Sequence, residues 1–388
     1  MKLLNKIYLQ IQFLIIKIFH RKDKVLVIPP TIMDGSFGDE LMLISFLEHN
    51  KKKKVIIYEE KNLIRKDLYN RYDNLEFLEW DEKIIFKNVS HAYVLGADNM
   101  TGAYGEKNPL FKIRFLNRCN KSGIKTYILG FSLNENVNSK IKEGLNIISK
   151  KTKLFLREEV SYNRALEFID NKFNVKQVAD LAFLSPMYSL NDDIFENWII
   201  NQKQNGRKIL AVCPNALQAK NIGEEKYISD IIILLKYSLK KHKISILLLY
   251  HDLRNHCNGK SDKDISSEIY NKLIDNFKDN LFFSSTIKNG LEMKYYLQDI
   301  DFTLTGRMHF GISGYSLNKP MIGIAYEGKF SGLQKIFDID SKETLINDML
   351  KISESEDKID YIINNFDQIN NNIKLNINKV KSLSLSNF

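Results

Sequence analysis

The stretch LTGRMHFGISGYSLNKPMIGIAYEGKF, residues 304–330, contains two short apolar runs, and each run is followed by a glycine and a cation. The residues that follow the two runs are Gly306, Arg307, His309, Glu327, Gly328 and Lys329. An apolar, β-rich run that leads into a helical pattern is the unit of a parallel sheet covered by helices. A cation in the first helical turn loses a few tenths to about 1 kcal/mol against the helix dipole, so its presence there needs a reason.

The same alternation of strand and helix patterns continues through most of the chain. Runs typical of strands occur at 24–30, 54–60, 91–97, 125–131, 153–159, 208–214, 244–252, 280–285, 301–305 and 320–326. Amphipathic stretches such as 38–49 and 138–149 lie between several of them. This alternation predicts an α/β fold with doubly wound, mainly parallel sheets.

The segment from Ser185 to Gly206 interrupts the alternation, because it has turn residues and little strand character. We therefore expect two facing Rossmann-like domains joined by a linker, and then a helical segment that packs back across the domains. The expected divisions are a basic amphipathic N-terminal helix at 1–23, a first domain at 24–187, the linker at 188–206, a second domain at 207–337 and a C-terminal helical segment at 338–388.

Composition agrees with two globular domains, because 388 residues with 44% hydrophobic and 27% charged content can form two cores. The net charge of +10 is spread along the chain, and the one dense run, Lys51–Lys54, is interpreted as a solvated loop. No basic stripe is interleaved with aromatic residues, so a nucleic-acid partner is not expected.

The three cysteines, Cys119, Cys213 and Cys257, are odd in number and far apart in the sequence. This predicts neither disulfides nor a metal site and fits a reducing cytosol.

The N-terminal stretch, residues 1–24, combines apolar residues with lysine and arginine. Gln10, Gln12 and Lys17 interrupt its apolar run and no small-residue cleavage site follows, so neither a signal peptide nor a spanning helix is expected. Two interpretations remain open. The stretch is a helix packed on the first domain, or it is a basic amphipathic helix whose residues 1–22 contact the inner membrane. The protein is accordingly expected in the cytoplasm, peripheral on that membrane in the second case.

The cations after the last two strands predict an anion site. In open α/β sheets ligands lie beyond the carboxyl ends of the strands, near helix N-termini that favour anions. Arg307 and His309 can share a target if the helix starts at or just after His309, because residues two apart in extended chain point the same way. Each residue also has an ordinary interpretation. His309 is then a hydrogen-bonded core histidine, Arg307 pairs with a carboxylate, and Lys329 is solvated. Their occurrence at successive strand ends favours the anion site.

A second candidate site is DGSFGDE, Asp34 to Glu40, which follows the first strand. Its two glycines permit unusual backbone angles and leave bare N–H groups at a helix start. The spacing is neither a dinucleotide fingerprint nor a P-loop. Asp39 and Glu40 either take part in a site or only complement the helix dipole.

Three further residues after strands carry weaker signals. Arg157 reaches the cleft or pairs with a neighbouring glutamate. His251 and His256, in YHDLRNH, resemble a metal spacing only superficially, since no third ligand is evident. No metal is expected.

Four stretches together resemble the polysaccharide pyruvyl transferase family, whose members have two facing Rossmann-like domains of the GT-B kind. They are DGSFGDELML, LREEVSYNRAL, VADLAFL and TGRMHFGISGYSLNKPMIGIAYEGKF. The resemblance implies transfer of the pyruvyl group of phosphoenolpyruvate to two hydroxyls of a sugar, in a bacterial surface polysaccharide or its lipid-linked oligosaccharide precursor. A ketal forms and phosphate is released, and phosphoenolpyruvate is a co-substrate, so no cofactor is expected.

The resemblance also implies roles for residues. The donor side comprises Gly306, Arg307, His309, Lys329 and Arg157. The acceptor side comprises Gly35, Ser36, Phe37, Gly38, Asp39 and Glu327. The expected catalytic residues are His309 as general acid or phosphate ligand, Arg307 as anion clamp and Asp39 as base for a sugar hydroxyl.

Two other functions remain open from the sequence. A GT-B glycosyltransferase would use the same cations to bind the diphosphate of a nucleotide sugar. A catalytically inactive protein would bind an anionic glycan without turnover.

Overall fold

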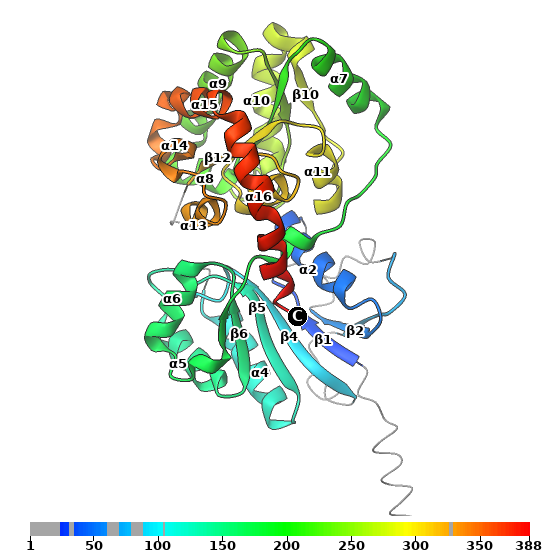
Figure 1. The fold of residues 1–388 in the computed structure, drawn as a ribbon, viewed down its shortest axis with the longest axis vertical. Coiled ribbons are helices and arrows are strands. Elements are labelled where there is room, and N and C mark those ends of the chain that lie inside the picture. The colour runs from blue at the N-terminus through cyan, green and yellow to red at the C-terminus, as the bar shows by residue number, and fades with distance from the viewer. Residues whose placement is uncertain (1–23, 31–34, 60–69, 79–87, 104, 326–328) are drawn as a thin grey trace, which may run out of the picture.

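The computed structural model describes residues 24–30, 35–59, 70–78, 88–103, 105–325 and 329–388. It contains two α/β domains, each built on one parallel sheet, which lie one above the other in Figure 1. The expected pair of facing Rossmann-like domains with a C-terminal helical segment is confirmed. The expected N-terminal helix at 1–23 lies outside the described residues. In the part of the chain that is described, no helix is long and apolar enough to cross a membrane.

The first sheet has seven strands in the order β3-β2-β1-β4-β5-β6-β7. Its strands are β1 Lys24–Ile28, β2 Lys54–Tyr58, β3 Leu75–Leu78, β4 Val89–Ala97, β5 Lys125–Phe131, β6 Thr152–Leu156 and β7 Val175–Gln177. The connecting helices are α2 Phe37–His49, α4 Lys107–Lys121, α5 Ser139–Ser149, α6 Glu159–Phe168, η2 Lys172–Asn174 and η3 Leu181–Leu184. The helices α4, α5 and α6 cover one face of the sheet, while α2 and η3 lie on the other.

The second sheet has six strands in the order β10-β9-β8-β11-β12-β13. Its strands are β8 Lys208–Cys213, β9 Ile244–Leu248, β10 Leu281–Phe283, β11 Phe302–Thr305, β12 Met321–Ile324 and β13 Leu345–Ile346. The helices up to β11 are α7 Asp193–Gln204, α8 Ala216–Ile222, α9 Glu224–Lys241, α10 Asp262–Phe277, η4 Lys278–Asn280 and α11 Gly290–Tyr296. The later helices are α12 Met308–Ser316, α13 Lys329–Lys335, α14 Ser341–Thr344, η5 Met349–Glu354, α15 Glu356–Asn364 and α16 Phe366–Leu385.

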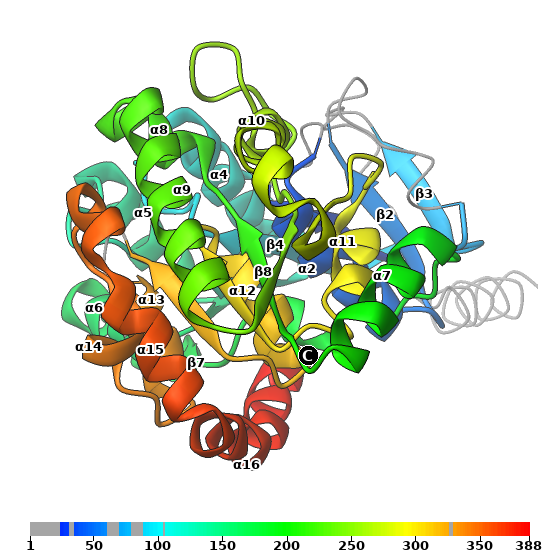
Figure 2. The same cartoon turned by 90° about the horizontal axis from the view of Figure 1, so that it is seen from above.

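Helix α7 lies within the segment 188–206 that the sequence predicts as a linker. Asp192 caps this helix by accepting a hydrogen bond from the Phe195 amide at 3.0 Å. The Phe195 ring then packs edge-on against Tyr296 of α11 at 4.7 Å between ring centroids. Figure 2 shows α7 and α11 together on one side of the second domain and α8 and α9 on the other. The chain therefore crosses between the domains just before α7 and joins the second domain through it.

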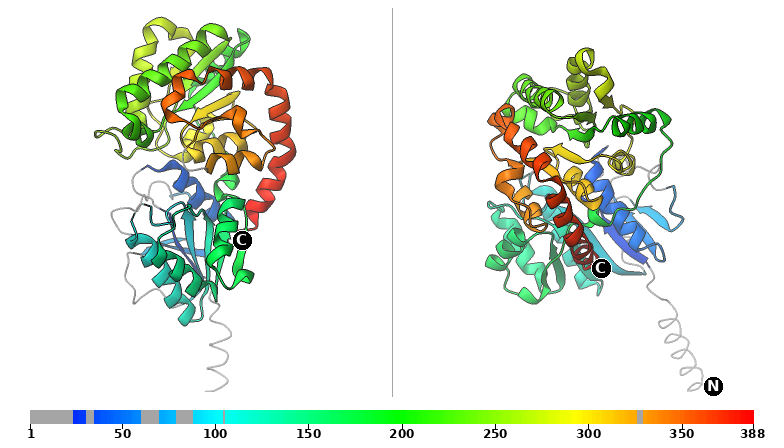
Figure 3. Two further views of the ribbon diagram at one scale, coloured as in Figure 1. Left: turned by 90° about the vertical axis from the view of Figure 1, so that its left-hand side faces the viewer. Right: turned by 45° about the horizontal axis from the view of Figure 1, so that its top comes forward.

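Besides the crossover, helices α16 and α2 tie the two domains together. Helix α16 runs from the second domain down to the first (Figure 3), where Asn387 donates to the Ala179 carbonyl at 2.9 Å. Helix α2 of the first domain packs against α11, and the buried Glu40 accepts a hydrogen bond from the Gly290 amide at 3.0 Å. A Cβ at Gly290 would lie only 2.6 Å from the Phe37 carbonyl oxygen, so this contact requires glycine. These contacts hold the facing loops of the two sheets close together.

Candidate active site

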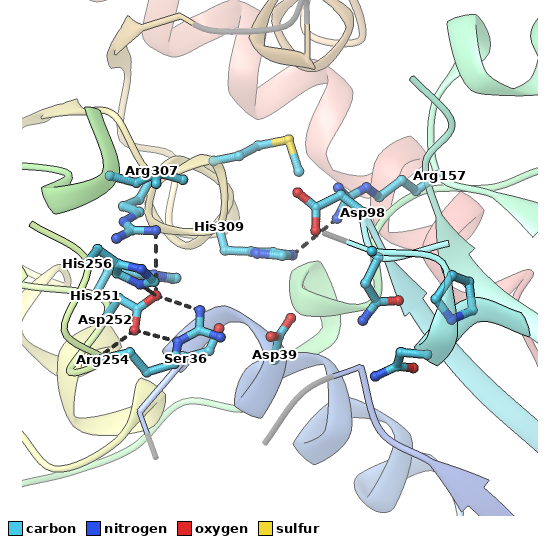
Figure 4. A pocket seen from close by; sticks show the side chains of 16 residues that line it. Ser36, Asp39, Asp98, Arg157, His251, Asp252, Arg254, His256, Arg307 and His309 are labelled. Atoms are coloured by element: carbon cyan, nitrogen blue, oxygen red, sulfur yellow. Dashed lines mark hydrogen bonds and ion pairs between the residues drawn. The ribbon is translucent and has the colours of Figure 1, made fainter. Parts of the chain in front are cut away.

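A cavity of about 310 Å³ lies between the carboxyl ends of the two sheets (Figure 4). In the first sheet the strand order reverses between β1 and β4, and in the second between β8 and β11. The loops after these strands meet at the cavity, as expected for a doubly wound sheet. The charged and polar side chains that line it include Ser36, Asp39, Asp98, Arg157, His251, Asp252, Arg254, His256, Arg307 and His309.

The first-domain end of the cavity is formed by an ion pair at the ends of β6 and β7. Arg157 donates from Nη1 to Asp180 Oδ2 at 2.7 Å and from Nε to Ser132 Oγ at 2.6 Å. Asp180 also accepts from the Ala182 amide at 2.8 Å and so caps η3. Both side chains of the ion pair are only 3% exposed, which makes this a buried pair held by further hydrogen bonds. Of the sequence alternatives for Arg157, the structure shows the cleft position, with Asp180 as its partner.

His309 reaches this ion pair from the second domain. Its Nε2 lies 3.2 Å from Asp180 Oδ2 and 3.3 Å from Arg157 Nη1. Its ring packs on Gly38 of α2, where a Cβ would lie 2.3 Å from His309 Nδ1. Burial alone would raise the pKa of the Asp180 carboxyl, but His309 and Arg157 hold that pKa below its ordinary value. The imidazole is therefore placed between a carboxylate and a guanidinium of the opposite domain.

Arg307 points to the other end of the cavity. Its Nε and Nη2 donate to Asp262 at 2.8 and 2.7 Å, and its Nη1 lies 3.5 Å from Asp252 Oδ2. Helix α12 begins at Met308, with Arg307 as its extended N-cap residue. His309 is therefore already inside the first turn, and the side chains of Arg307 and His309 diverge. The expectation that they share one target, which assumed an extended chain up to His309, is not met. The ordinary interpretation of Arg307, a pair with a carboxylate, is what the structure shows.

Asp252 gathers three cationic or imidazole groups at the Arg307 end. Arg254 donates to it from Nε at 2.8 Å and from Nη2 at 2.6 Å, and His256 Nε2 lies 3.1 Å away. Although burial opposes the charge of Asp252, these contacts hold its pKa well below the ordinary value. Burial raises the pKa of Asp262, with Arg307 opposing the rise. This end of the cavity is a network of ion pairs within the second domain.

The loop predicted for the acceptor side joins the two domains. The Phe37 amide donates to the His251 carbonyl at 3.1 Å, and the Leu253 amide donates to the Gly35 carbonyl at 3.1 Å. Gly35 has a φ of +108°, and a Cβ there would lie 2.5 Å from the Leu253 side chain, so both backbone angle and space require glycine. The loop is therefore bridged to the loop that follows β9.

Asp39 and Ser36 line the cavity, whereas Phe37 is completely buried in the core. Burial raises the pKa of the Asp39 carboxyl above its ordinary value, and Asp98 adds to the rise while Arg254 and His309 oppose it. A carboxylate with a raised pKa at a cavity wall is suited to accept a proton.

Three other predicted residues lie away from the cavity surface or outside the description. Gly306 is packed inside the second domain, where a Cβ would lie 2.0 Å from Gln218 Oε1 and where its carbonyl accepts from Asn215 at 2.8 Å. Lys329 opens helix α13, but its side chain lies outside the described residues. Glu327 also lies outside them.

His251 is a cavity residue to which the sequence assigns no role. Its side chain is 4% exposed, and its Nε2 has no hydrogen-bond partner among the residues that the structure describes. Burial, with His309 and Arg307 nearby, lowers the pKa of His251 well below its ordinary value. This imidazole nitrogen is therefore both buried and without a partner among the described residues. The signal available in the sequence was its place near the end of the strand run 244–252, and Asp98 directly follows the run 91–97.

The side chains of the described residues include no group of three or more His, Cys, Asp or Glu that could hold a metal ion. The chemistry of the cavity as described is that of arginine, histidine and aspartate.

Residues 1–328 match the model of a family described as polysaccharide pyruvyl transferase. The chain belongs to this family. It is therefore a transferase that acts in the pyruvylation of polysaccharides, and the family implies a sugar or polysaccharide acceptor. No match was found among curated protein sequences.

Solved structures with the same fold include a glycosyltransferase and proteins bound to UDP or a UDP-sugar, at low sequence identity. S. aureus MnaA in its UDP co-structure has a TM-score of 0.60, 11% identity and coverage of 90% of both chains. A glycosyltransferase from Rickettsia africae has a TM-score of 0.55 and 15% identity, covering 94% of this chain and 96% of its own. UDP-GlcNAc 2-epimerase from Neisseria meningitidis bound to UDP-GlcNAc has a TM-score of 0.56 and 11% identity, covering 93% and 97%. At these identities the likeness shows the GT-B fold alone.

Proposed function

We propose that the protein transfers the pyruvyl group of phosphoenolpyruvate to two hydroxyls of one sugar in a bacterial surface polysaccharide or its lipid-linked precursor. The observation that carries the proposal is His309 of one domain between Arg157 and Asp180 of the other, at the wall of the interdomain cavity. Phosphoenolpyruvate brings a carboxylate and a phosphate to a site with this cation and this proton carrier.

The proposed reaction begins with a proton from His309 to the methylene carbon of phosphoenolpyruvate, which becomes a methyl group. A sugar hydroxyl attacks the cationic carbon and loses its proton to a base. The bond from that carbon to the phosphate oxygen then breaks, phosphate leaves, and the second hydroxyl attacks and loses its proton to close the ketal. Atoms balance with phosphoenolpyruvate as co-substrate, so no cofactor is proposed.

His309 is suited to the acid role by its two partners. The Asp180 carboxylate favours a proton on Nε2 of His309, whereas the Arg157 guanidinium disfavours it. The two effects oppose each other. The domain contact at Gly38 fixes the ring and limits its rotation. An imidazole nitrogen can carry a proton and deliver it to a substrate, which suits general acid catalysis.

Arg157 is proposed to bind an anionic group of the donor. Nη1 and Nε are engaged with Asp180 and Ser132, whereas Nη2 forms no hydrogen bond with the described residues. A charged hydrogen bond from this group to a carboxylate or phosphate contributes roughly 1.5–3 kcal/mol. Lys329 is proposed to neutralise a second anionic group, and Arg307 to contribute positive charge while Asp262 holds its guanidinium.

The acceptor sugar is proposed to lie against Asp39, Ser36 and His251. Asp39 would take the proton of the attacking hydroxyl, for which its raised pKa is favourable.

The test is thermal unfolding of the wild type, Arg157→Lys and the control Lys335→Ala, each with phosphoenolpyruvate, UDP or GDP. Lys335 is exposed, lies outside the cavity and forms an ion pair with Glu159. A ligand at 100 times its Kd stabilises the fold by about 2.7 kcal/mol, which is a measurable shift in Tm. We expect a shift with phosphoenolpyruvate that is kept in the control and lost in Arg157→Lys. A shift with a nucleotide alone would instead identify a nucleotide-sugar glycosyltransferase.

Binding without turnover would identify a glycan-binding protein that has lost catalysis. Phosphate release from phosphoenolpyruvate, measured with surface glycan fractions as acceptors, distinguishes this outcome from the proposed transferase.

A further inference from the structure

The edge of the first sheet that faces away from the cavity collects lysines from separate parts of the sequence. Because all strands of this sheet are parallel, their N-terminal ends lie together at the edge opposite the second domain (Figure 1). Exposed lysines at the starts of β2, β5, β6 and β7, or in the turns before them, include Lys52, Lys53, Lys125, Lys151, Lys153 and Lys176, and these six are here called the lysine edge.

The lysine edge has an excess of positive charge. None of its six lysines is within ion-pair distance of a carboxylate in the described part of the chain. Two carboxylates nearby, Glu76 and Glu48, are already paired with Lys24 and Lys51. Asp73 and Asp170 also lie in loops at this edge, but they are too few to balance the lysines. An unbalanced cluster of this kind creates a local positive potential that attracts anionic surfaces.

Aromatic side chains lie among these lysines. The amine of Lys153 lies 5.7 Å from the centre of the Tyr127 ring, and that of Lys176 lies 5.9 Å from the centre of the Phe155 ring. Phe173, in the short η2 helix before β7, is 100% exposed. A single exposed phenylalanine is unremarkable on a solvated surface. Among unpaired lysines it matches the pattern of a surface that enters the headgroup region, with an apolar ring inserted and amines at the phosphates.

The chain before β1 attaches at the same edge. The sequence before Lys24 carries Lys2, Lys6, Lys17, Arg21 and Lys22 among apolar residues, and β1 starts beside β2 with Lys24 opposite Lys54. A basic stretch of sequence therefore directly precedes the strand that starts at this edge.

We propose that the lysine edge and Phe173 dock the protein on a bilayer that contains anionic lipids. The cavity lies at the carboxyl ends of strands five to nine residues long, so it is held roughly 17–30 Å beyond the docked edge. Docking at this edge keeps the interdomain cavity away from the lipid surface. If the proposed function holds, the sugar that is modified lies some distance along the glycan from its lipid anchor.

The test is co-sedimentation of the full chain with phosphatidylcholine vesicles, with and without about one part in four of phosphatidylglycerol. The variant Lys125→Glu/Lys153→Glu/Lys176→Glu reverses the charge of the edge. Its control, Lys220→Glu/Lys240→Glu/Lys278→Glu, makes the same net change on exposed lysines of the second domain. We expect the wild type to bind only the anionic vesicles, the edge variant to bind at least about tenfold more weakly, and the control to bind within about twofold of the wild type. Phe173→Ala is expected to weaken binding further without affecting Tm.

Two results would overturn the proposal. One is vesicle binding that is kept in the edge variant and lost when residues 1–22 are deleted, since the N-terminal segment would then act alone. The other is binding of heparin with no binding of anionic vesicles, which would identify a general polyanion surface. All these lysines are exposed, so unchanged Tm and unchanged phosphate release in the variants separate docking from folding and from the proposed reaction.

Discussion

The two ends of the cavity carry similar side chains but hold them in different ways. At the Arg307 end the ion pairs lie within the second domain and are short, with 2.7 Å from Arg307 Nη2 to Asp262 and 2.6 Å from Arg254 Nη2 to Asp252. At the His309 end the contacts cross between domains and are longer, with 3.2 Å to Asp180 and 3.3 Å to Arg157. Contacts across a domain boundary change when the domains move, whereas contacts inside one domain are kept.

This difference suggests different roles for Arg307 and His309, although they are only two residues apart. The guanidinium of Arg307 forms two hydrogen bonds with the buried Asp262 carboxylate. Arg307 is therefore held in the cavity wall, where it contributes positive charge. His309 has only long contacts with its partners, so a ligand can replace them at small cost. Under the proposed function, the reactive end is therefore the one built from both domains, and the other end is a scaffold.

The largest expected effect is on catalysis at the His309 end. His309→Asn removes the proton carrier and is expected to lower kcat for phosphate release by about 10²–10⁴-fold. The fold should be little affected, because the side chain has no short hydrogen bond to lose. Rates and thermal unfolding are measured on the same preparations. A drop in Tm as large as that caused by breaking a buried ion pair would show that His309 is structural.

The next effect is on stability at the Arg307 end. Asp262→Ala leaves Arg307 without its bidentate partner and also removes the acceptor for the Ala216 amide at 2.8 Å. Breaking a buried pair from one side costs about 3–5 kcal/mol in the free energy of unfolding.

The control for this variant is Asp299→Ala, which breaks an exposed pair with Lys203 and is expected to cost no more than about 1 kcal/mol. Denaturant unfolding measures both. Equal costs for the two variants would mean that Arg307 does not depend on Asp262, and the comparison between the two ends would fail.

The sequence predicts which loops form this site, but it does not predict which side chains pair there. Loops after strands are predictable, because apolar runs mark the strands and the carboxyl ends of parallel strands meet at one edge; Asp39, Arg157 and His309 follow from this. The partners of these residues are not predictable in this way. Asp180 lies 129 residues from His309 and Asp262 lies 45 residues from Arg307, so only the folded chain pairs them.

The start of helix α12 and the lysine edge illustrate the same limit. The sequence does not specify whether the helix begins before or after His309, yet that single turn decides where Arg307 points. The lysines that form the edge are spread from Lys52 to Lys176, and they lie together only because the strands are parallel. Local pattern thus predicts the elements, whereas topology decides which charges meet.

The smallest expected effect joins the two ends through Asp39. Arg254 belongs to the Arg307 end, yet its charge lowers the pKa of Asp39, which burial has raised. If Asp39 is the base, kcat/KM falls as the pH drops through the pKa of Asp39, because the protonated carboxyl cannot accept a proton. Arg254→Gln removes a charge that favours the carboxylate, so this pKa rises further and the acidic limb moves to higher pH.

The measurement is the pH profile of kcat/KM for the wild type, Arg254→Gln and the control Arg164→Gln, whose arginine lies outside the cavity. The control limb should coincide with that of the wild type. Asp39→Asn should remove the limb together with most of the activity. A limb that persists in Asp39→Asn and still moves with Arg254→Gln would belong to another group, and Asp39 would then bind the acceptor without taking its proton. In that case Arg254 would affect the pH profile through a residue other than Asp39. The next variant to measure would be one at His309.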